Sequence, residues 1–473
     1  MALPNVMQTG RSGMVAAKAQ MATTSHNISN ANTEGFSRQR VQQKADGVSP
    51  HGGKNLIGTG TLLARTERIN DNYIEKQIRN AGRDLANLEE KDLALKQTED
   101  IFNEMGGEGL NRIVSKFFNE FRKLANEPDN EAVRQSVRES SLAMANDFKR
   151  LRSSVEDVRS HLDARVEGFA SEMNAVTEQV KDLNQKIKIQ EISGAVANDL
   201  RDQRDLAMKN LSTYADVQVH LDKDGAYNID MKGVGPLLSG PVAETLTVYR
   251  SPDDGEGKPE NSFAIRSSGN ASNDITHALK GGKIGALLEV RDQTLSGILN
   301  RLDDMATTIT DSVNALHREG ITRYGTSGVD FFKAQPNKER ASQYMELSDA
   351  VANDANQIAA GALPDSPGDN RIAVAISQIQ NMRVMDGGNA SIDSYYNGIV
   401  SDVGVHAGRT RNALVQQKDI GMQLNKMREQ ISGVSIDEET ANLLQFQRAF
   451  DASAKVISVA DQCLETVLNL RRG

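Results

Sequence analysis

Residues that could do chemistry are scattered along this sequence rather than grouped. The chain has 7 His and 1 Cys, and no two histidines have the HExxH spacing that places a metal-binding pair on one face of a helix. We expect His26 to have a polar role at a surface or between helices. The single cysteine, Cys463, can form neither an internal disulfide nor a multi-cysteine metal site. The sequence therefore predicts no metal centre and no cofactor.

Two acidic motifs predict structure rather than catalysis. The "DKDG" at Asp222, followed by Asn228 and Asp230, does not have the carboxylate spacing of a calcium loop, so a hairpin turn is the better interpretation. Asp202 and Asp205 alternate with arginines in "DLRDQRD", a pattern typical of a solvent-exposed helix face with weak ion pairs. Because no nucleophile, base or metal ligand is grouped with another, we expect a protein that is not an enzyme.

The elements that position these residues must be built from few aromatic side chains. The chain has 473 residues, enough for about two to four domains. Only 4% of the residues are aromatic and none is Trp, which favours helical seams over deep globular pockets.

A net charge of -9 argues against nucleic-acid binding. We find no cleaved secretory signal and no apolar run of about 18 residues that predicts a membrane span. A cytosolic location is expected unless a dedicated export route exists.

Apolar residues spaced three and four apart predict a mainly α fold. The longest run extends from Met144 to Ile187, with one doubled spacing of four at Leu162 and Val166 that locally unwinds a left-handed supercoil. At a rise of 1.5 Å per residue, this rod is about 65 Å long. Further amphipathic helices are expected at 74–102, 110–124, 284–316 and 395–432.

Both ends of the chain carry weaker heptad seams. Near the N-terminus, large apolar residues recur every seven positions, and small residues follow three positions after each: Met7, Met14, Met21 and Ile28, then Gly10, Ala17, Thr24 and Ala31. The C-terminal seam has the same spacing of seven at Leu443, Phe450, Ile457 and Leu464, and the residues three positions after each are Phe446, Ser453, Ala460 and Val467. Short seams of this kind bury little alone. We expect them to pair with each other and with neighbouring copies, and the plain alternative is an intramolecular coil only.

The periodicity changes to two after the long rod. Val217, Val219 and Leu221 alternate with polar residues before the turn, and Tyr227 and Ile229 continue the alternation after it, which predicts a hairpin. The fold prediction is therefore mainly α, with long coiled-coil-like helical rods from both chain ends and a small β-rich inserted domain. The expected domains are an inner coiled-coil domain, a helical rod domain and a β-rich outer insertion, comprising 1–45 with 433–473, 46–216 with 276–432, and 217–275, with 320–366 an irregular outer segment.

Two terminal and three internal stretches resemble a known family. The stretch "TTSHNISNANTEGFSRQRV" is similar to the N-terminal signature of bacterial flagellar rod, hook and hook-associated proteins, and "GVSIDEETANLLQFQRAFDASAKVISVADQCLETVLNL" resembles the C-terminal half of that family's terminal pair. The internal stretches "NDLRDQRDLAMKNLS", "ALLEVRDQTLSGILNRLDDMATTITDSVNALH" and "GDNRIAVAISQIQ" resemble the hook-associated members in particular. The region after His317 looks shorter than in many members.

The resemblance implies a structural subunit of the bacterial flagellum. Such a subunit polymerises through its terminal helices into a ring at the junction of hook and filament and provides the base on which the filament assembles. The implied partners are further copies of the chain, the hook protein and hook-associated protein 3. Members of the family are exported unfolded by the flagellar type III apparatus, and a chaperone covers the C-terminal helix before export. The implied location is extracellular, without a cleaved signal.

The seams and the resemblance together define the candidate assembly residues. These are Met7, Met14, Met21, Asn27, Ile28, Asn30, Asn32, Gly35, Phe36, Leu443, Phe446, Phe450, Ile457 and Leu464. The residues implied for the chaperone are Leu443, Phe450, Ile457, Leu464 and Val467. We expect the asparagines to bond exposed carbonyls where copies meet, and Gly35 to supply a permissive backbone. Local capping without contact between copies is the alternative for the three asparagines.

Other functions remain open from the sequence. Hook-associated protein 3 or another axial subunit would share the same terminal motifs. A cytosolic coiled-coil scaffold would explain the rods but not the weak terminal seams. An enzyme hidden in the insertion would need clustered catalytic residues, which we do not find in the sequence.

Overall fold

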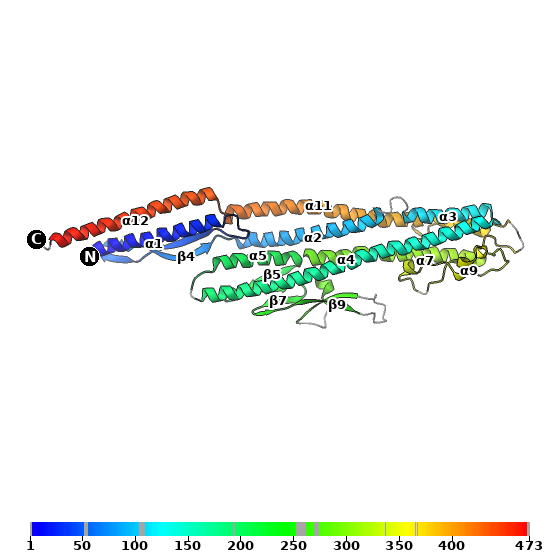
Figure 1. The fold of residues 1–473 in the computed structure, drawn as a ribbon, viewed down its shortest axis with the longest axis horizontal. Helices are drawn as coiled ribbons and strands as arrows, with labels where there is room; N and C mark the ends of the chain where they lie inside the picture. The colour runs from blue at the N-terminus through cyan, green and yellow to red at the C-terminus, as the bar shows by residue number, and fades with distance from the viewer. Residues whose placement is uncertain are drawn as a thin grey trace. The chain divides into compact units, whose positions relative to one another are not determined.

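The protein is described by a computed structural model that covers residues 2–51, 55–103, 109–192, 194–251, 262–268, 274–335, 337–364, 366 and 368–470. Long helices dominate it, with a few small antiparallel sheets (Figure 1), which confirms the predicted fold class. Two compact units are present. The first comprises Met1–Ala86, Ala170–Gly282 and Gln416–Gly473, and the second comprises Asn87–Phe169 and Lys283–Val415.

The helices follow the predicted apolar spacings. The longer ones are α1 (Ala2–Ser29), α2 (Asn72–Asn103), α3 (Leu110–Asn126), α4 (Glu131–Glu191), α5 (Asn198–Tyr214), α7 (Ser296–Glu319), α11 (Ile392–Ser432) and α12 (Ile436–Leu470). Shorter ones are α6 (Gly282–Glu289), α8 (Ala341–Tyr344), α9 (Asp349–Asn353) and α10 (Arg371–Gln378). The predicted rod lies within α4, which is 61 residues long and buries Met144, Phe148 and Leu162 of the predicted seam. A π-helical turn at Val290–Leu295 joins α6 to α7 and was not predicted.

Two groups of strands belong to the first unit. The predicted hairpin is β5 (Val217–Leu221) with β6 (Tyr227–Met231), and β7 (Gly235–Ser239) and β8 (Val242–Ala243) extend it to four strands in the order β5-β6-β7-β8. Next to it in the chain, β9 (Leu246–Ser251) pairs with β10 (Ser262–Ser267). The second group consists of β1 (Gln39–Ala45) paired with β4 (Thr61–Arg68), and β2 (Val48–His51) paired with β3 (Asn55–Gly58).

The second group of strands departs from the prediction. The predicted rod domain starts at residue 46, yet β2, β3 and β4 precede the first helix of that domain. The sequence of β1, "QRVQQKA", has no apolar alternation. In the structure this strand has no buried face, because the residues after Gln39 are half-buried or exposed. A strand of this kind gives little periodic signal, and pairing with β4 and packing on α1 determine its conformation.

The division into units also differs from the predicted domains. The boundaries at Ala86, Phe169 and Val415 lie inside α2, α4 and α11. Because these helices continue through the boundaries, neither their apolar spacing nor a glycine or proline cluster marks the change. The chain ends and the β-rich insertion belong to one unit, whereas the sequence analysis assigned them to separate domains.

An aromatic cluster lies in the core of the second unit, among buried aliphatic residues. Phe117 and Phe121 of α3 meet Phe331 and Phe332 of the irregular segment, with ring centroids 4.8 to 6.0 Å apart. His317, at the end of α7, contacts Phe331 edge-on at 5.3 Å. Edge-to-face contacts of this kind add stability beyond the area they bury. The segment 320–366 has only short helices, and this cluster attaches its first part to the helices.

Candidate assembly interface

The two chain ends form an antiparallel helical pair in the first unit. Asn27 near the end of α1 contacts Glu439 near the start of α12, and Gly10 near the start of α1 contacts Ile457 further along α12. Figure 1 shows the two helices side by side and running in opposite directions. A Cβ atom on Gly10 would lie 2.8 Å from Cγ1 of Ile457. Glycine at this position therefore allows the two helices to approach closely. The expected pairing of the two seams occurs within the chain.

The buried side of α1 is its small-residue side. Gly10, Ala17 and Thr24 are buried. The large members of the predicted seams are all half-buried, at Met7, Met14, Met21, Ile28, Leu443, Phe446, Phe450, Ile457 and Leu464. Part of each large side chain thus remains in contact with solvent, so the pairing of α1 with α12 alone does not bury the seam residues fully.

Further apolar side chains on the two helices are exposed. They are Val6, Val15, Leu444, Val456, Val459, Val467 and Leu468. Val467, predicted for the chaperone, is 55% exposed, and Cys463 is exposed as well. Among the described residues of α12, only Glu439 and Ala460 are buried. An elongated helix pair with this much exposed apolar surface is typical of a surface that another chain covers.

The predicted asparagines have three different environments. Asn27 is 1% exposed, and its side-chain amide donates to the carbonyl of Gln39 (2.9 Å) and accepts from the Gln39 N–H (3.0 Å). Asn30 donates to the His26 carbonyl at 3.0 Å, which is a local cap of α1. Asn32 is exposed in the turn. Contacts within the chain therefore account for Asn27 and Asn30, and Asn32 alone is free for another partner.

The turn after α1 has the backbone that the sequence predicted. Gly35 has φ of 81°, in the left-handed region where glycine has no steric cost. A Cβ atom at Gly35 would lie 3.1 Å from Cβ of Leu206 in α5. The half-buried ring of Phe36 meets the His26 ring edge-on at 5.5 Å. The turn therefore directs the chain from α1 along α5 into β1.

A polar junction links the segment after this turn to α12. Glu439 is 2% exposed and accepts hydrogen bonds from Asn27 (3.1 Å) and from Arg38 Nε (2.7 Å). Arg38 also donates to Glu438 at 3.1 Å. Through these contacts the polar junction joins the N-terminal and C-terminal motifs.

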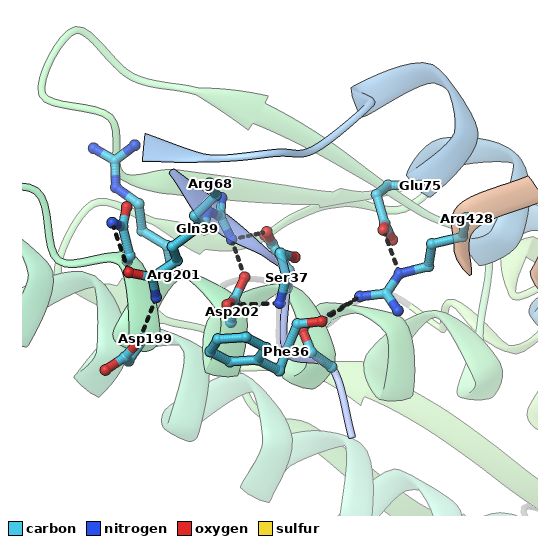
Figure 2. Close-up of polar contacts among 12 residues, drawn as sticks. Phe36, Ser37, Gln39, Arg68, Glu75, Asp199, Arg201, Asp202 and Arg428 are labelled. Carbon is cyan, nitrogen blue, oxygen red and sulfur yellow. Dashed lines mark hydrogen bonds and ion pairs between the residues drawn. The ribbon is translucent and has the colours of Figure 1, made fainter. Parts of the chain in front are cut away.

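Helix α5 supplies the second side of the polar junction (Figure 2). The buried carboxylate of Asp202 accepts from the Ser37 N–H (3.0 Å) and from Arg68 of β4 (2.7 Å). Arg68 also donates to Asp205 at 2.8 Å. Burial raises the pKa of the Asp202 carboxyl, although Arg68 and Ser37 act in the opposite direction. The Gln39 amide donates to Asp199 at 2.7 Å.

Helix α11 supplies the third side. Arg428 donates through Nε to Glu75 of α2 at 2.7 Å and through Nη2 to the carbonyls of Gly35 and Phe36 at 3.3 and 3.4 Å (Figure 2). A charged side chain thus satisfies two carbonyls of the turn that have no helical partner.

The polar junction corrects one expectation and adds residues that the sequence analysis missed. Asp202 and Arg204 are 5% and 2% exposed, so "DLRDQRD" is not a solvent-exposed face. Arg204 donates to Asn184 (2.9 Å) and to the Gly225 carbonyl (3.0 Å), and its guanidinium lies 3.6 Å from the centre of the Tyr227 ring. The residues that the analysis missed are Ser37, Arg38, Gln39, Arg68, Glu75, Asp199, Asp202, Arg428 and Glu439. Many of them lie within the motifs that carry the family resemblance, which was the available signal.

Comparison with known proteins identifies the family. The sequence model described as the flagellar hook-associated protein FlgK helical domain matches residues 95–332, just over half of the chain. The chain belongs to the FlgK family. Models of the flagella basal body rod protein and of the flagellar basal body rod FlgEFG protein C-terminal region match residues 7–36 and 429–470. The family therefore confirms the resemblance that the terminal and internal motifs indicated.

Full-length relatives agree with this membership. Flagellar hook-associated protein 1 of Bacillus subtilis is 29% identical over 98% of this chain and 97% of the relative. The protein of the same name from Salmonella typhimurium is 24% identical over 99% of this chain and 100% of the relative. Like other members of the FlgK family, the chain is a component of the external structure of the flagellum and assembles with other flagellar components.

A solved structure shares the fold. The flagellar hook junction protein FlgK from Burkholderia pseudomallei has a TM-score of 0.65 at 17% identity and covers 75% of this chain and 100% of its own. None of the helices in the described residues combines the length and apolarity needed to cross a membrane.

Proposed function

We propose that this chain is the structural subunit that forms the junction between hook and filament. In this proposal it polymerises into a ring through α1 and α12 and provides the base on which the filament assembles. The observation that carries the proposal is the helix pair at the chain ends: it is held by the polar junction, and its large apolar residues remain half-buried or exposed. The names of the full-length relatives support the same role.

The half-buried seam residues would contact neighbouring copies in this arrangement. Fully burying a side chain such as Leu or Phe contributes about 1.5 to 3 kcal/mol. Covering the part of each of the nine seam residues that is still exposed would contribute a fraction of this at each position, summed over all the copies in the ring. Small residues such as Gly10 and Ala17 bring the two helices of one chain together. The larger residues are then free to contact other chains, the hook protein on one side and hook-associated protein 3 on the other.

The export route is part of the proposal. We infer export in an unfolded state through the flagellar type III apparatus, with a chaperone that covers α12 beforehand. The exposed apolar residues Leu444, Val459 and Val467 support this, because an unfolded or partly folded α12 would expose an apolar stripe to the cytosol. A truncated chain ending before residue 436 should lose co-purification with the chaperone. The proposal includes no catalytic activity.

Immunogold electron microscopy of whole cells tests the proposed position. With an epitope inserted in the turn between β5 and β6, we expect gold particles at one site per flagellum, where hook meets filament. Label along the filament would favour a different axial subunit. Label confined to the cytosol would favour the coiled-coil scaffold.

A further inference from the structure

A recess in the first unit lies between α2 and the free edge of the four-stranded sheet. Its volume is about 340 Å³. Arg79 and Arg83 of α2 form one wall, Val217 and Val219 of β5 form the other, and Met208 of α5 lies at the base. We call this recess the β5 groove. The candidate assembly residues do not line it.

The wall formed by β5 presents unpaired backbone groups. β5 is the first strand in the sheet order and pairs only with β6. The Lys232 N–H donates to the Asp216 carbonyl (3.0 Å), and the Asp222 N–H donates to the Ala226 carbonyl (2.9 Å). Because residues in an antiparallel ladder alternate between bonding inward and outward, this phase directs the N–H and C=O groups of Val217, Val219 and Leu221 away from β6. No other described element forms a hydrogen bond to them.

The opposite wall has an excess of positive charge. Lys76, Arg79, Arg83 and Lys232 line the groove together with a single carboxylate, Asp216. Asp216 is shared by Arg83, at 2.5 Å, and Lys232, at 3.7 Å. Lys76 and Arg79 have no ion-pair partner among the described residues. Arg83 also binds Asp84 at 2.8 Å. Lys76 and Arg79 are therefore the two cations that give the groove its unpaired positive charge, in a chain whose net charge is -9.

We propose that the β5 groove binds an extended acidic segment of a partner protein, which adds a strand to the sheet beside β5. Backbone hydrogen bonds to Val217, Val219 and Leu221 would supply affinity, as in other cases of strand addition. Acidic side chains on the face of the added strand that lies toward α2 would meet Lys76 and Arg79. The charge of this wall favours acidic over neutral or basic segments. This binding surface is independent of the proposed role of α1 and α12.

Hydrogen–deuterium exchange of the full chain tests the proposal. The probe is a blocked synthetic peptide in which Glu and Val alternate, and the comparison probe has Lys in place of each Glu. We expect the acidic peptide to slow exchange at Val217, Val219 and Leu221 by about twofold when the peptide concentration equals its Kd. The basic peptide should leave exchange there unchanged.

Two matched variants test whether the protection from exchange depends on Lys76 and Arg79. The double substitution Lys76→Glu with Arg79→Glu should abolish the protection. Lys96→Glu with Lys116→Glu makes the same change in charge at exposed positions outside the groove and should keep the protection. Circular dichroism of both variants checks that they fold.

Three results would overturn the proposal. If no protection appears at millimolar peptide, Lys76 and Arg79 serve only to keep the strand edge unpaired, a common role of edge lysines. If the basic peptide protects equally, the charge assignment is wrong. If protection arises without peptide and increases with protein concentration, a second copy occupies the groove in place of a different partner.

Discussion

Asn27 and Glu439 lie 412 positions apart in the sequence and are joined by a hydrogen bond of 3.1 Å. The same asparagine satisfies both backbone groups of Gln39, and the same glutamate binds Arg38. One pair of side chains therefore links the end of α1, the start of β1 and the start of α12. The ends of the chain are held together by specific polar contacts as well as by the apolar seam.

Replacing Asn27 tests this linkage. Asn27→Ala leaves the buried N–H and C=O of Gln39 without partners, and each such group costs about 1 to 3 kcal/mol. We expect the midpoint of urea unfolding, followed by circular dichroism, to fall clearly. Asn32→Ala is the matched control, because Asn32 is exposed in the same turn. Equal midpoints for the two variants would show that Asn27 has no structural role.

Arg68 is expected to be the critical cation of the polar junction. Its side chain is 13% exposed and lies between Asp202 and Asp205. Arg68→Ala would leave the Asp202 carboxylate buried with one N–H partner, and removing one member of a buried pair costs about 3 to 5 kcal/mol. Arg65→Ala, on the same strand but 60% exposed, should cost less than about 0.5 kcal/mol. Chemical unfolding of both variants measures the difference, and a small effect at Arg68 would contradict the assignment.

His317 should make the stability of the second unit depend on pH. It is fully buried, its Nδ1–H donates to the Val329 carbonyl at 2.7 Å, and its Nε2 accepts from the Ala359 N–H at 2.8 Å. Burial lowers its pKa from 6.5 to about 4. Below pH 6.5 the unfolded chain gains a proton that the folded chain does not, so stability falls as the pH decreases toward 4 and is constant above 6.5. The loss amounts to about 3 kcal/mol at 1.36 kcal/mol per pKa unit.

Many carboxylates also titrate in this pH range. Comparing the stability of the natural chain with that of His317→Gln separates the contribution of His317 from theirs. We expect the free energy of unfolding of the variant to depend less on pH between 4 and 6.5. His161→Gln, at an exposed position, should keep the full dependence. Parallel pH profiles for His317→Gln and the natural chain would show that His317 titrates normally.

A charge in the C-terminal seam should separate export from assembly. Phe450 is half-buried on α12, so Phe450→Asp would place a carboxylate where neighbouring chains are proposed to meet. We expect the variant to appear in the culture medium while the cells lack filaments and do not swim. Ala452→Asp, at an exposed position two residues on, should support swimming. Normal filaments on cells with Phe450→Asp would refute the seam assignment.

The sequence predicted features that repeat locally and missed those that depend on distant partners. Apolar spacing placed most of the long helices, and strict alternation placed the β5–β6 hairpin. The strands at 39–68 lack alternation, because their partners rather than a buried face determine them. Asp202 and Arg204 have the pattern of an exposed helix face, yet Ser37, Arg68 and Asn184 bury them. The proposed function predicts that neighbouring chains cover the exposed parts of the seam residues.

Deletion of the gene, followed by electron microscopy of the cells and assay of the medium for flagellin, tests the central claim most directly. A subunit of the junction is needed before filament can grow on the hook. The account predicts cells with bare hooks and flagellin lost to the medium, and restoration of filaments by the natural gene. Intact filaments on the deletion strain would contradict a role at the junction.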